Sequence, residues 1–318
     1  MAQVDVVITC YQYARYLRDC VSSVLAQDLR DIRVLIIDNA STDGSADIAR
    51  ALGKEDSRVS VVAREKNLGR HASLNEGIDW AESKYFMLLD ADDLLAPGAL
   101  RRAAVVMDQN PDVSFAYGTE HNMSFGPDVI PSIPDQSSLA VWEILAGKKY
   151  ISDLCDGVLR YIAPTTVIRR TSSQKAVGHH RTDLGYTDDL EMFLRLATVG
   201  GVARTNAIQG IRRTHPQQLS TDLAGAMIHK YEEDEAAFDS FFVHEGATLD
   251  NVHDLRRRAK HTLSNRAYWS GISHARRGRL KESWELLHFA VARRPISAVV
   301  PPVYELFQTD RLFKKSKT

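Results

Sequence analysis

The chain has 318 residues, of which 44% are hydrophobic and 25% charged, and its formal net charge is −1. These values are close to those of average folded proteins, so they exclude a wholly disordered chain, a collagen-like repeat and a multi-span membrane protein. The length allows about two domains at roughly 150 residues each. The three cysteines, Cys10, Cys20 and Cys155, follow no zinc or disulfide spacing and indicate a reducing compartment.

Short apolar runs alternate with helical patterns over the first 120 residues. The runs predict strands at 4–9, 33–37, 59–63, 85–89 and 113–117. The helical patterns between them lie around 17–25, 45–52, 71–80 and 100–107. Strands that are apolar throughout and alternate with helices predict an α/β, doubly wound, mainly parallel sheet with helices on both faces. Ligands of such sheets bind beyond the carboxyl ends of the strands, so the residues after each strand are the first functional candidates.

The pattern weakens in the middle of the chain. Three prolines, Pro127, Pro131 and Pro134, predict a long loop or flap between about 118 and 160. Beyond it we expect the following elements in order: a strand at 161–168, a helix at 188–198 and a strand at 202–208.

Only helical periods occur from about residue 223 onward. A helix with Leu255 and Leu263 on one face is followed by a break at Gly278 and a second helix at 282–292. We predict that Trp284, Leu287 and Val291 of the second helix point inward, as in a helical hairpin that packs as a cap.

Charge is distributed unevenly along the chain. Of the 40 Lys/Arg and 41 Asp/Glu residues, 15 and 5 lie in residues 251–318, a balance of +10, which leaves −11 for residues 1–250. We therefore expect an α/β domain at 1–222 and a basic helical region at 223–318. The basic region, with Phe307 and Phe313 in its tail, suits peripheral contact with an anionic membrane, and solvated helix faces explain the same charge.

Several classes of protein are not indicated. A strand is predicted within four residues of the start and no run approaches the ~18 apolar residues of a spanning helix, so we expect a cytoplasmic protein. The phosphate-binding and nucleophile-elbow glycine motifs are absent from the sequence. The Lys/Arg pattern does not indicate nucleic-acid binding.

Three carboxylates in four residues, Asp90, Asp92 and Asp93, directly follow the predicted strand 85–89. Adjacent carboxylates repel one another, and a hard divalent cation that also binds a diphosphate is one reason for such a cluster. Acidic turns also begin helices, and Asp92 and Asp93 could start the helix that follows Pro97. The cluster by itself leaves both interpretations open.

Polar residues also follow the first two predicted strands. Asp38 follows strand 33–37. Its carboxylate could accept a hydrogen bond from the N–H group of a nucleotide base, or it could form an Asx-turn. Thr9 and Tyr11 follow the first strand, where the aromatic ring suits stacking on a base or packing at the rim of the core.

Two further candidates lie in the second half of the chain. Asp188 and Asp189 open the predicted helix 188–198. They could supply a general base beside a cleft, or they could be an ordinary helix start. Arg213 and His215 suit a diphosphate or a metal ion, although a lone surface histidine is the more common finding.

Taken in chain order, these segments resemble the inverting glycosyltransferases of family two, which have a GT-A fold. The resemblance covers about residues 3–120 well and 160–220 in part. It rests on five ordered motifs: VDVVITCYQ at 4–12, SSVLAQ at 22–27, IIDNASTDGS at 36–45, NLGR at 67–70 with Asn75 and Gly77, and LDADD at 89–93 with Pro97. The chain departs from the family pattern at Asn39 and Asp188, where the family usually has Asp and Glu.

The resemblance implies a nucleotide-sugar donor and a role for each matching residue. Thr9, Tyr11 and Asp38 are expected to hold the base and ribose. Arg70 and Arg213 are expected to reach the nucleotide and its diphosphate.

The same resemblance implies a divalent metal ion, Mn or Mg, and a catalytic base. Asp90 and Asp92 are expected to contact the ribose and the metal, with Asp92 as the direct ligand, and His215 to lie near the metal or the diphosphate. Asp189 is expected to be the base.

We therefore expect an enzyme that transfers a sugar, with UDP-sugar as the first choice of donor, to a saccharide or lipid-linked saccharide in bacterial surface polysaccharide biosynthesis. Two alternatives are a non-catalytic binding or scaffold protein with the same fold, and a sugar nucleotidyltransferase. The second would need a glycine-rich phosphate loop after the first strand, where this chain has Tyr11-Gln12-Tyr13.

Overall fold

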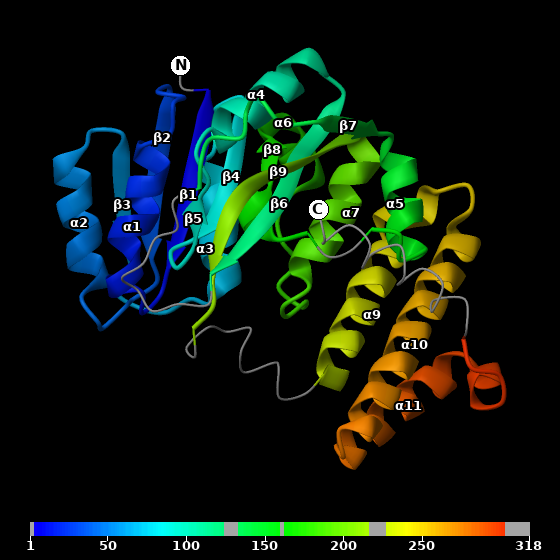
Figure 1. Ribbon diagram of the computed structural model, residues 1–318. Coiled ribbons are helices and arrows are strands. Elements are labelled where there is room, and N and C mark those ends of the chain that lie inside the picture. The colour runs from blue at the N-terminus through cyan, green and yellow to red at the C-terminus, as the bar shows by residue number, and fades with distance from the viewer. Residues whose placement is uncertain (1–2, 124–132, 160–161, 216–226, 303–318) are drawn as a thin grey trace. The chain divides into compact units, whose positions relative to one another are not determined.

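The computed structural model describes residues 3–123, 133–159, 162–215 and 227–302 (Figure 1). The chain forms two compact units, each discontinuous in sequence. Unit 1 is made of Met1–Ile151, Tyr161–Asp183 and Asp188–Gln218, and unit 2 of Ser152–Arg160, Leu184–Thr187 and Leu219–Thr318. The predicted boundary at 222/223 and the tail with Phe307 and Phe313 lie outside the described residues.

Unit 1 is built on one mixed sheet, in which most paired residues belong to parallel neighbours. The strands are β1 Val4–Cys10, β2 Ile32–Asp38, β3 Val59–Ala63, β4 Tyr85–Asp90, β5 Leu94–Leu95, β6 Val113–Met123, β7 Trp142–Leu145, β8 Ile168–Arg170 and β9 Gly201–Arg213. Their order is β3-β2-β1-β4-β8-β6-β9-β5, and β7 pairs with β9. The first four strands run parallel, because a helix follows β1, β2 and β3 and returns the chain to the same end of the sheet.

Helices cover both faces of this sheet (Figure 1). They are α1 Ala14–Leu25, α2 Ser45–Glu55, α3 Arg70–Trp80, α4 Ala99–Gln109, α6 Thr171–Val177 and α7 Asp188–Val199, while α5 Gly147–Cys155 has residues in both units. Successive strand residues point to opposite faces. Val6 and Ile8 therefore share a buried cluster with residues of α1, α2 and α4. Val7 packs in a separate cluster with Leu74 and Ile78 of α3.

Most of the predicted elements of the first 120 residues are confirmed. Each of the five predicted strands and four predicted helices lies in an element of the same type. The α/β class with helices on both faces is therefore correct. It could be predicted because apolar runs and helical periods are local signals.

Two predictions in the middle of the chain are wrong. The expected strand at 161–168 is a 3-10 helix, η1 Pro164–Thr166, before the short β8, because proline has no N–H to donate to a strand ladder. The expected loop at 118–160 is too long: it contains the end of β6, all of β7 and α5, while residues 133–141 form neither helix nor strand and 124–132, with Pro127 and Pro131, lie outside the described residues. β6 continues to Met123 because it pairs with β9, which itself runs to Arg213 rather than ending at 208. Such long-range pairing leaves little trace in the local sequence.

Within residues 227–302 all the regular elements of unit 2 are helices, as predicted. It contains α9 Met227–Val243, η2 Glu245–Thr248, α10 Val252–Arg276, α11 Leu280–Arg293 and η3 Pro295–Ala298. Gly278, with φ of +75°, lies in the turn of the α10–α11 hairpin. None of the described helices has the length and apolar character that crossing a bilayer requires.

The inward face of α11 differs from the prediction. The buried residues are Ser283, Leu286, Phe289 and Ala290, whereas the side chain of Trp284 is 71% exposed. Leu287 is half-buried and packs against Gly271 of α10, and Val291 is half-buried, so the prediction is wrong for Trp284 alone. Trp284 is therefore an aromatic residue that the fold leaves in water.

Candidate active site

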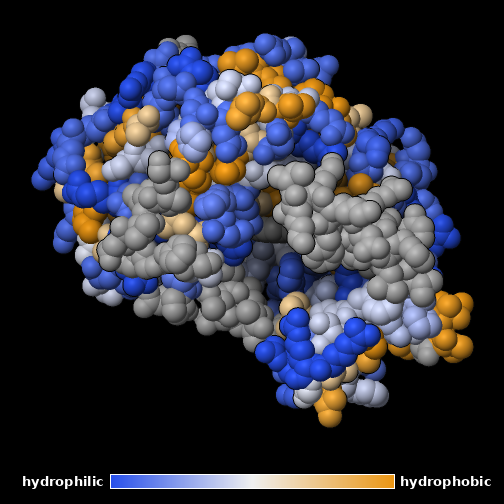
Figure 2. Space-filling model, in the orientation of Figure 1, coloured by the Kyte–Doolittle hydropathy of each residue, from blue (hydrophilic) through white to orange (hydrophobic). Residues whose placement is uncertain are grey.

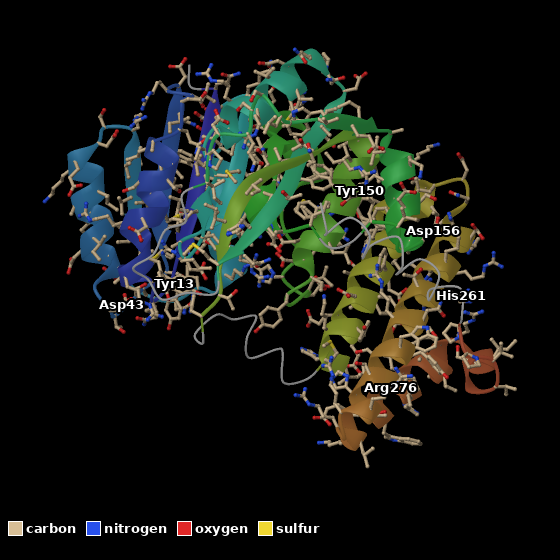
Figure 3. The ribbon with its side chains drawn as sticks, in the orientation of Figure 1. Tyr13, Asp43, Tyr150, Asp156, His261 and Arg276 are labelled. Atoms are coloured by element: carbon tan, nitrogen blue, oxygen red, sulfur yellow. The ribbon has the colours of Figure 1, made fainter. Side chains whose placement is uncertain are left out.

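The carboxyl ends of β2, β1 and β4 bring three predicted residues to one edge of the sheet. In the parallel register Cys10 lies opposite Asp38, and Thr9 lies opposite Asp90. The Thr9 hydroxyl donates a hydrogen bond of 2.9 Å to Asp90 Oδ1. Figure 3 shows Tyr13 and Asp43, from the loops that follow β1 and β2, at this same edge.

Asp38 is almost fully buried, and its two carboxylate oxygens have different surroundings. Oδ2 accepts a hydrogen bond of 3.1 Å from the backbone N–H of Ser41. Oδ1 has no hydrogen-bond partner among the described residues. A buried acceptor without a donor is costly, so the position fits a ligand that brings an N–H or O–H group. The turn interpretation of Asp38 is therefore met by Oδ2, and the contact of Oδ1 with a nucleotide base stays a prediction.

The loops after β1 and β2 are held in an unusual backbone conformation. Gln12 and Ala40 have φ values of +62° and +63°, a region that residues other than glycine rarely adopt. The Gln12 N–H donates to Ser41 Oγ at 2.9 Å, which ties the two loops together. Tyr11, at the tip, is 46% exposed. Strained loops of this kind concentrate at ligand sites.

Asn39, one of the two departures from the family pattern, is a hydrogen-bond centre. Its side-chain nitrogen donates to Asn67 Oδ1 at 2.7 Å, and its oxygen accepts from Leu68 N and Arg64 Nη1, both at 3.0 Å. An aspartate could accept but not donate. The amide therefore suits the loop that leads into α3 and Arg70.

The acidic loop Asp90–Asp93 lies at the end of β4. Asp92 and Asp93 are buried, and they do not begin a helix, because β5 intervenes and α4 starts only at Ala99. Burial raises the pKa of Asp90; the charge of Arg70 opposes this and that of Asp92 adds to it. Burial, and then the charge of Asp92, raises the pKa of Asp93 well above its usual range. The loop thus concentrates carboxylates out of water, which is unfavourable without a cation.

Asp93 connects this loop to the end of β9. Its Oδ1 accepts a hydrogen bond of 3.1 Å from the backbone N–H of Arg213, and its Oδ2 accepts one from the Thr165 hydroxyl. Two residues later, His215 Nε2 lies 3.2 Å from Asp92 Oδ2. The structure therefore brings Asp92 and His215, 123 residues apart, into direct contact.

The donor atoms of Asp92 and His215 fit a divalent ion. Two ligand atoms at about 2.1 Å from Mg and at right angles to each other are about 3 Å apart, close to the distance observed. The rings of Tyr13 and Tyr16 pack against His215 at centroid distances of 5.6 and 4.8 Å and hold the imidazole in place.

Arg213 is buried and has protein contacts of its own. Its Nη2 lies 2.8 Å from Asp19 Oδ2, and its guanidinium lies 5.0 Å from the centre of the Tyr16 ring. The predicted contact between Arg213 and a diphosphate therefore competes with the ion pair to Asp19.

The second carboxylate pair, Asp188 and Asp189, lies at the start of α7. Arg70 Nη1 donates to both oxygens of Asp188 at 2.9 Å, and Arg70 Nη2 reaches Asp189 Oδ2 at 3.4 Å. His180 Nδ1 lies 2.6 Å from Asp188 Oδ2, and His71 Nε2 lies 3.6 Å from it. Arg70, predicted to reach the nucleotide, is thus placed on the two aspartates.

These surroundings give the two adjacent carboxyl groups opposite properties. Burial alone would raise the pKa of Asp188, but the charge of Arg70 and the contact with His180 hold it well below its usual range. Burial, and then the negative charge of Asp188, raises the pKa of Asp189 to about 7. Asp188 therefore stays ionised, while Asp189 can take up and release a proton near neutral pH.

His180, Asp188 and Asp189 also form a set of three potential metal ligands, with ligand atoms within 4.8 Å of one another. Within the part of the chain that the structure describes, no other such set occurs, and it is not the predicted Asp90, Asp92 and His215. Arg70 already compensates both carboxylates of this set. Its charge disfavours a cation there.

Sequence reasoning missed several residues around Asp188 and Asp189. Asn75 clamps the backbone of His180, since its Oδ1 accepts from the His180 N–H at 2.8 Å and its Nδ2 donates to the His180 carbonyl at 3.1 Å. The adjacent His179 and His180, shortly before the acidic pair, were the available signal. Asn75 was noted only as part of a motif.

Arg169 of β8 was also missed. It is buried between the rings of Phe86 and Phe193, at 5.6 and 5.5 Å, and two of its nitrogens have no hydrogen-bond partner among the described residues. Burial lowers its pKa to about 10, against the opposing charges of Asp189 and Asp188. Its strand was predicted at the wrong position, which hid the face on which the side chain lies.

Comparison with known proteins finds similarity to glycosyltransferases. The profile of the family described as "Glycosyl transferase family 2" matches residues 5–176, more than half of the chain. An uncharacterized glycosyltransferase of Haemophilus influenzae is 22% identical over 240 residues, or 74% of this chain and 70% of that protein. In three other curated relatives, all described as glycosyltransferases, the match spans only 31% to 40% of the relative's own length.

Two solved structures share the fold. S. aureus TarS 1–349 in complex with UDP-GlcNAc has a TM-score of 0.65 at 16% identity, over 94% of this chain and 82% of that chain. The mannosyltransferase PcManGT from Pyrobaculum calidifontis, in complex with GDP-Man and Mn²⁺, has a TM-score of 0.62 at 16% identity, over 99% and 81%. These likenesses confirm the predicted GT-A type fold, and the family match argues against a scaffold protein or a nucleotidyltransferase. The chain belongs to glycosyl transferase family 2 and is a glycosyltransferase.

Proposed function

We propose that the chain is an inverting glycosyltransferase that moves a sugar from a nucleotide-sugar donor, UDP-sugar first, to a hydroxyl of a saccharide or lipid-linked saccharide. The observation that carries the proposal is the pair Asp188 and Asp189. Asp188 is held ionised, whereas the pKa of Asp189 is raised to about 7. A general base works best when its pKa lies near the operating pH.

Asp189 is the proposed base, which decides between the two adjacent aspartates. It would take the proton from the acceptor hydroxyl as the oxygen attacks the anomeric carbon from the face opposite the leaving diphosphate. Asp188, Arg70 and His180 would act as positioning residues. Since Arg70 touches both carboxylates, it orients Asp189, while the charge of Asp188 keeps Asp189 basic.

The nucleotide is proposed to bind over the loops after β1 and β2. The unpaired, buried Oδ1 of Asp38 suits the imide N–H of uracil, and the exposed ring of Tyr11 suits stacking on the base. The hydrogen-bonded pair Thr9 and Asp90 suits the ribose. Arg70 and Arg213 remain proposed contacts of the phosphates, although both now have carboxylate partners.

A divalent ion, Mn or Mg, is proposed to be held by Asp92 and His215, with Asp90 beside them. When bound, such an ion supplies Lewis-acid and counter-charge stabilisation to a departing diphosphate. Support comes from the 3.2 Å contact of the two donor atoms and from the concentration of buried carboxylates in the loop.

Donor binding can be tested by calorimetry and thermal shift with UDP, GDP, dTDP and CDP, each with and without Mn or Mg. We expect a metal-dependent shift with UDP that disappears in Asp92→Ala and persists in the control Asp47→Ala, an exposed aspartate on α2. No binding to any of the four nucleotides would contradict the proposed donor site.

The stereochemical outcome tests the base separately. The product of an inverting enzyme has the opposite anomeric configuration to the donor, which NMR of the early product reports. Retention of configuration would exclude direct attack assisted by Asp189, even if donor binding were confirmed.

We propose a saccharide or lipid-linked acceptor of bacterial surface polysaccharide biosynthesis, and a domain division near residue 222. A lipid-linked acceptor requires an enzyme that reaches a membrane surface, and the basic C-terminal region is the proposed contact.

A further inference from the structure

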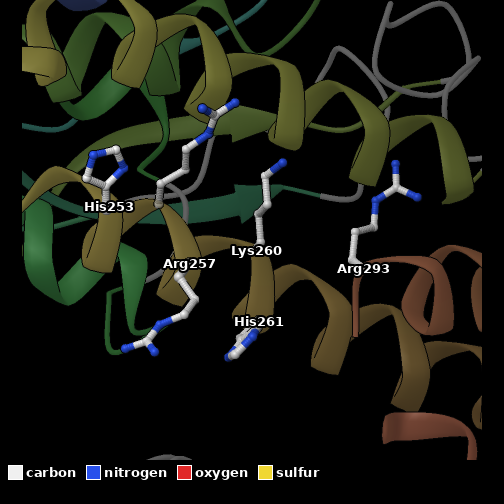
Figure 4. A pocket seen from close by; sticks show the side chains of 6 residues that line it. His253, Arg257, Lys260, His261 and Arg293 are labelled. Carbon is white, nitrogen blue, oxygen red and sulfur yellow. The ribbon is translucent and has the colours of Figure 1, made fainter. Parts of the chain in front are cut away.

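Two groups of cations lie on the α10–α11 hairpin of unit 2, and ion pairs neutralise the arginines and the lysine of the first group. The first group lines an open pocket of about 300 Å³ formed by His253, Arg256, Arg257, Lys260, His261 and Arg293 (Figure 4). Arg256 pairs with Asp239 at 2.9 Å, and Arg293 pairs with Glu235 at 2.5 Å. These pairs link α10 and α11 to α9. The arginines of this pocket therefore hold the helices of unit 2 together through ion pairs.

The second group lies at the turn between α10 and α11, from the last residue of α10 to the second residue of α11. Arg276, Arg277, Arg279 and Lys281 fall within six residues, and all are exposed. None of them forms a hydrogen bond or ion pair through its side chain with any residue that the structure describes. Figure 3 shows Arg276 at the end of α10. These four cations have no side-chain partner among the described residues and so suit an anionic partner.

Two large apolar side chains accompany these cations. Leu280 and Trp284 are each 71% exposed, and their spacing of four residues places them on one side of α11. Figure 2 shows an exposed hydrophobic spot at the lower tip of the helical unit, among hydrophilic residues. An exposed leucine and an exposed tryptophan therefore lie next to the four cations along the chain.

We propose that this turn, residues 276–284, is a docking site for a membrane that contains anionic phospholipids. Unpaired cations complement the anionic headgroups, and leucine and tryptophan suit the boundary between headgroups and acyl chains. Within the turn, Glu282 is the only acidic residue, so the cations exceed it by three. The turn is a convex helix end rather than a groove, which favours a lipid surface over a peptide.

The inference is independent of the donor site. The choice of a membrane as partner rests on the proposed membrane contact of the C-terminal region. The inference assigns that contact to the turn rather than to the tail. Vesicle binding needs no nucleotide, metal or acceptor. Loss of catalysis and loss of docking can therefore be observed separately.

The test is co-sedimentation of the full chain with vesicles of phosphatidylcholine containing about one third phosphatidylglycerol. We expect binding at low salt, little binding to pure phosphatidylcholine, and release at ~0.5 M salt. Each cation near an anionic surface contributes roughly fivefold, so removing three should lower the partition coefficient by roughly 100-fold. The test variant is Arg276→Gln, Arg277→Gln, Arg279→Gln, and the control with the same charge change in unit 1 is Arg18→Gln, Arg50→Gln, Lys54→Gln.

A second variant separates insertion from charge attraction. Vesicles with brominated lipids should quench the fluorescence of the intact chain, and Trp284→Phe should lose most of that quenching while still sedimenting. Since the side chains of the turn are exposed, thermal midpoints should stay unchanged in all variants.

Three results would overturn the proposal. The intact chain could stay in the supernatant with anionic vesicles at low salt. The test and control variants could bind equally. The chain could bind a soluble polyanion such as polyphosphate but no vesicle, which would assign the cations to a different partner.

Discussion

Unit 1 contains two regions rich in carboxylates, and their surroundings differ. In the acidic loop Asp90–Asp93, the charge of Asp92 raises the pKa of both Asp90 and Asp93, Arg70 opposes this at Asp90, and His215 contacts Asp92. At the start of α7, Asp188 is enclosed by Arg70, His71 and His180, and Asp189 shares Arg70. The first region gathers negative charge that a cation would relieve. The second is already compensated and retains one carboxyl group that titrates near neutral pH.

Residue type therefore does not decide the protonation behaviour of an aspartate. Asp188 and Asp189 are neighbours in sequence, yet the pKa of one is lowered and that of the other is raised to about 7. The difference arises because Arg70, at the start of α3, donates to both oxygens of Asp188 at 2.9 Å but reaches Asp189 only at 3.4 Å, and because His180 contacts Asp188. Each prediction below changes one side of this comparison.

The largest effect is expected from Asp189→Asn. Loss of the base should lower the rate of transfer, or of donor hydrolysis, by about 10²- to 10⁴-fold, while calorimetry should find donor binding nearly unchanged. Asp47→Asn on α2 serves as a control that leaves the rate intact. If donor binding fell as much as the rate, Asp189 would belong to the donor site instead.

Asp188→Asn should act mainly on stability. It removes the anion that Arg70 Nη1 and the buried His180 contact, although Arg70 Nη2 keeps its contact with Asp189, and breaking such a buried pair costs up to about 3–5 kcal/mol in the free energy of unfolding. Denaturant unfolding at neutral pH measures this loss. Because the folded-state pKa of Asp188 is lowered, its contribution is present above the usual carboxyl pKa and is lost as pH falls, so the two proteins should converge in acid. A stable Asp188→Asn protein at neutral pH would show that the clamp is unimportant.

Asp92→Ala tests which of the two regions binds metal. At 100 times the dissociation constant, a bound ion stabilises the fold by about 2.7 kcal/mol, so Mn should raise the thermal midpoint of the intact chain but not of the variant. His180→Ala should keep the shift. If instead His180→Ala lost the shift and Asp92→Ala kept it, the ion would bind at His180, Asp188 and Asp189.

The pH dependence of the rate should report Asp189. A base must be deprotonated, so the rate should rise about tenfold per pH unit below pH 7 and level off above it. Removing the negative charge in Asp188→Asn should move the profile toward lower pH, since that charge is one cause of the raised pKa. A flat profile between pH 5 and 8, around the value of about 7 expected for this group, would argue against Asp189 as the base.

The smallest effect is expected from Asn39→Asp. The change removes the donor to Asn67 and sets two acceptors against each other, at a cost of about 1–3 kcal/mol. Thermal unfolding should register this loss, with a modest fall in activity because the loop leads into Arg70. An unchanged or higher midpoint would mean that Asp at this position is equally well accommodated by Arg64.

Much of unit 1 could be predicted from the sequence. β1, β2 and β4 are short apolar runs, and Asp38 and Asp90 follow them directly, so their meeting at one sheet edge follows from parallel pairing. The ordered motifs identified the family, which the comparisons confirm. The helical character of residues 227–302 was equally visible, because a period of 3.6 residues is a local property.

Only the tertiary structure decided how the polar residues are paired. The contact of Asp92 with His215, the clamp of Asn75 on His180, and the position of Arg70 on Asp188 and Asp189 join residues more than 100 positions apart. It likewise decided that Trp284 lies in water while Leu286 is buried. Local patterns determine which elements form because backbone periodicity depends on near neighbours. Charge, protonation and exposure depend on what packs alongside, and that is determined only when distant elements meet.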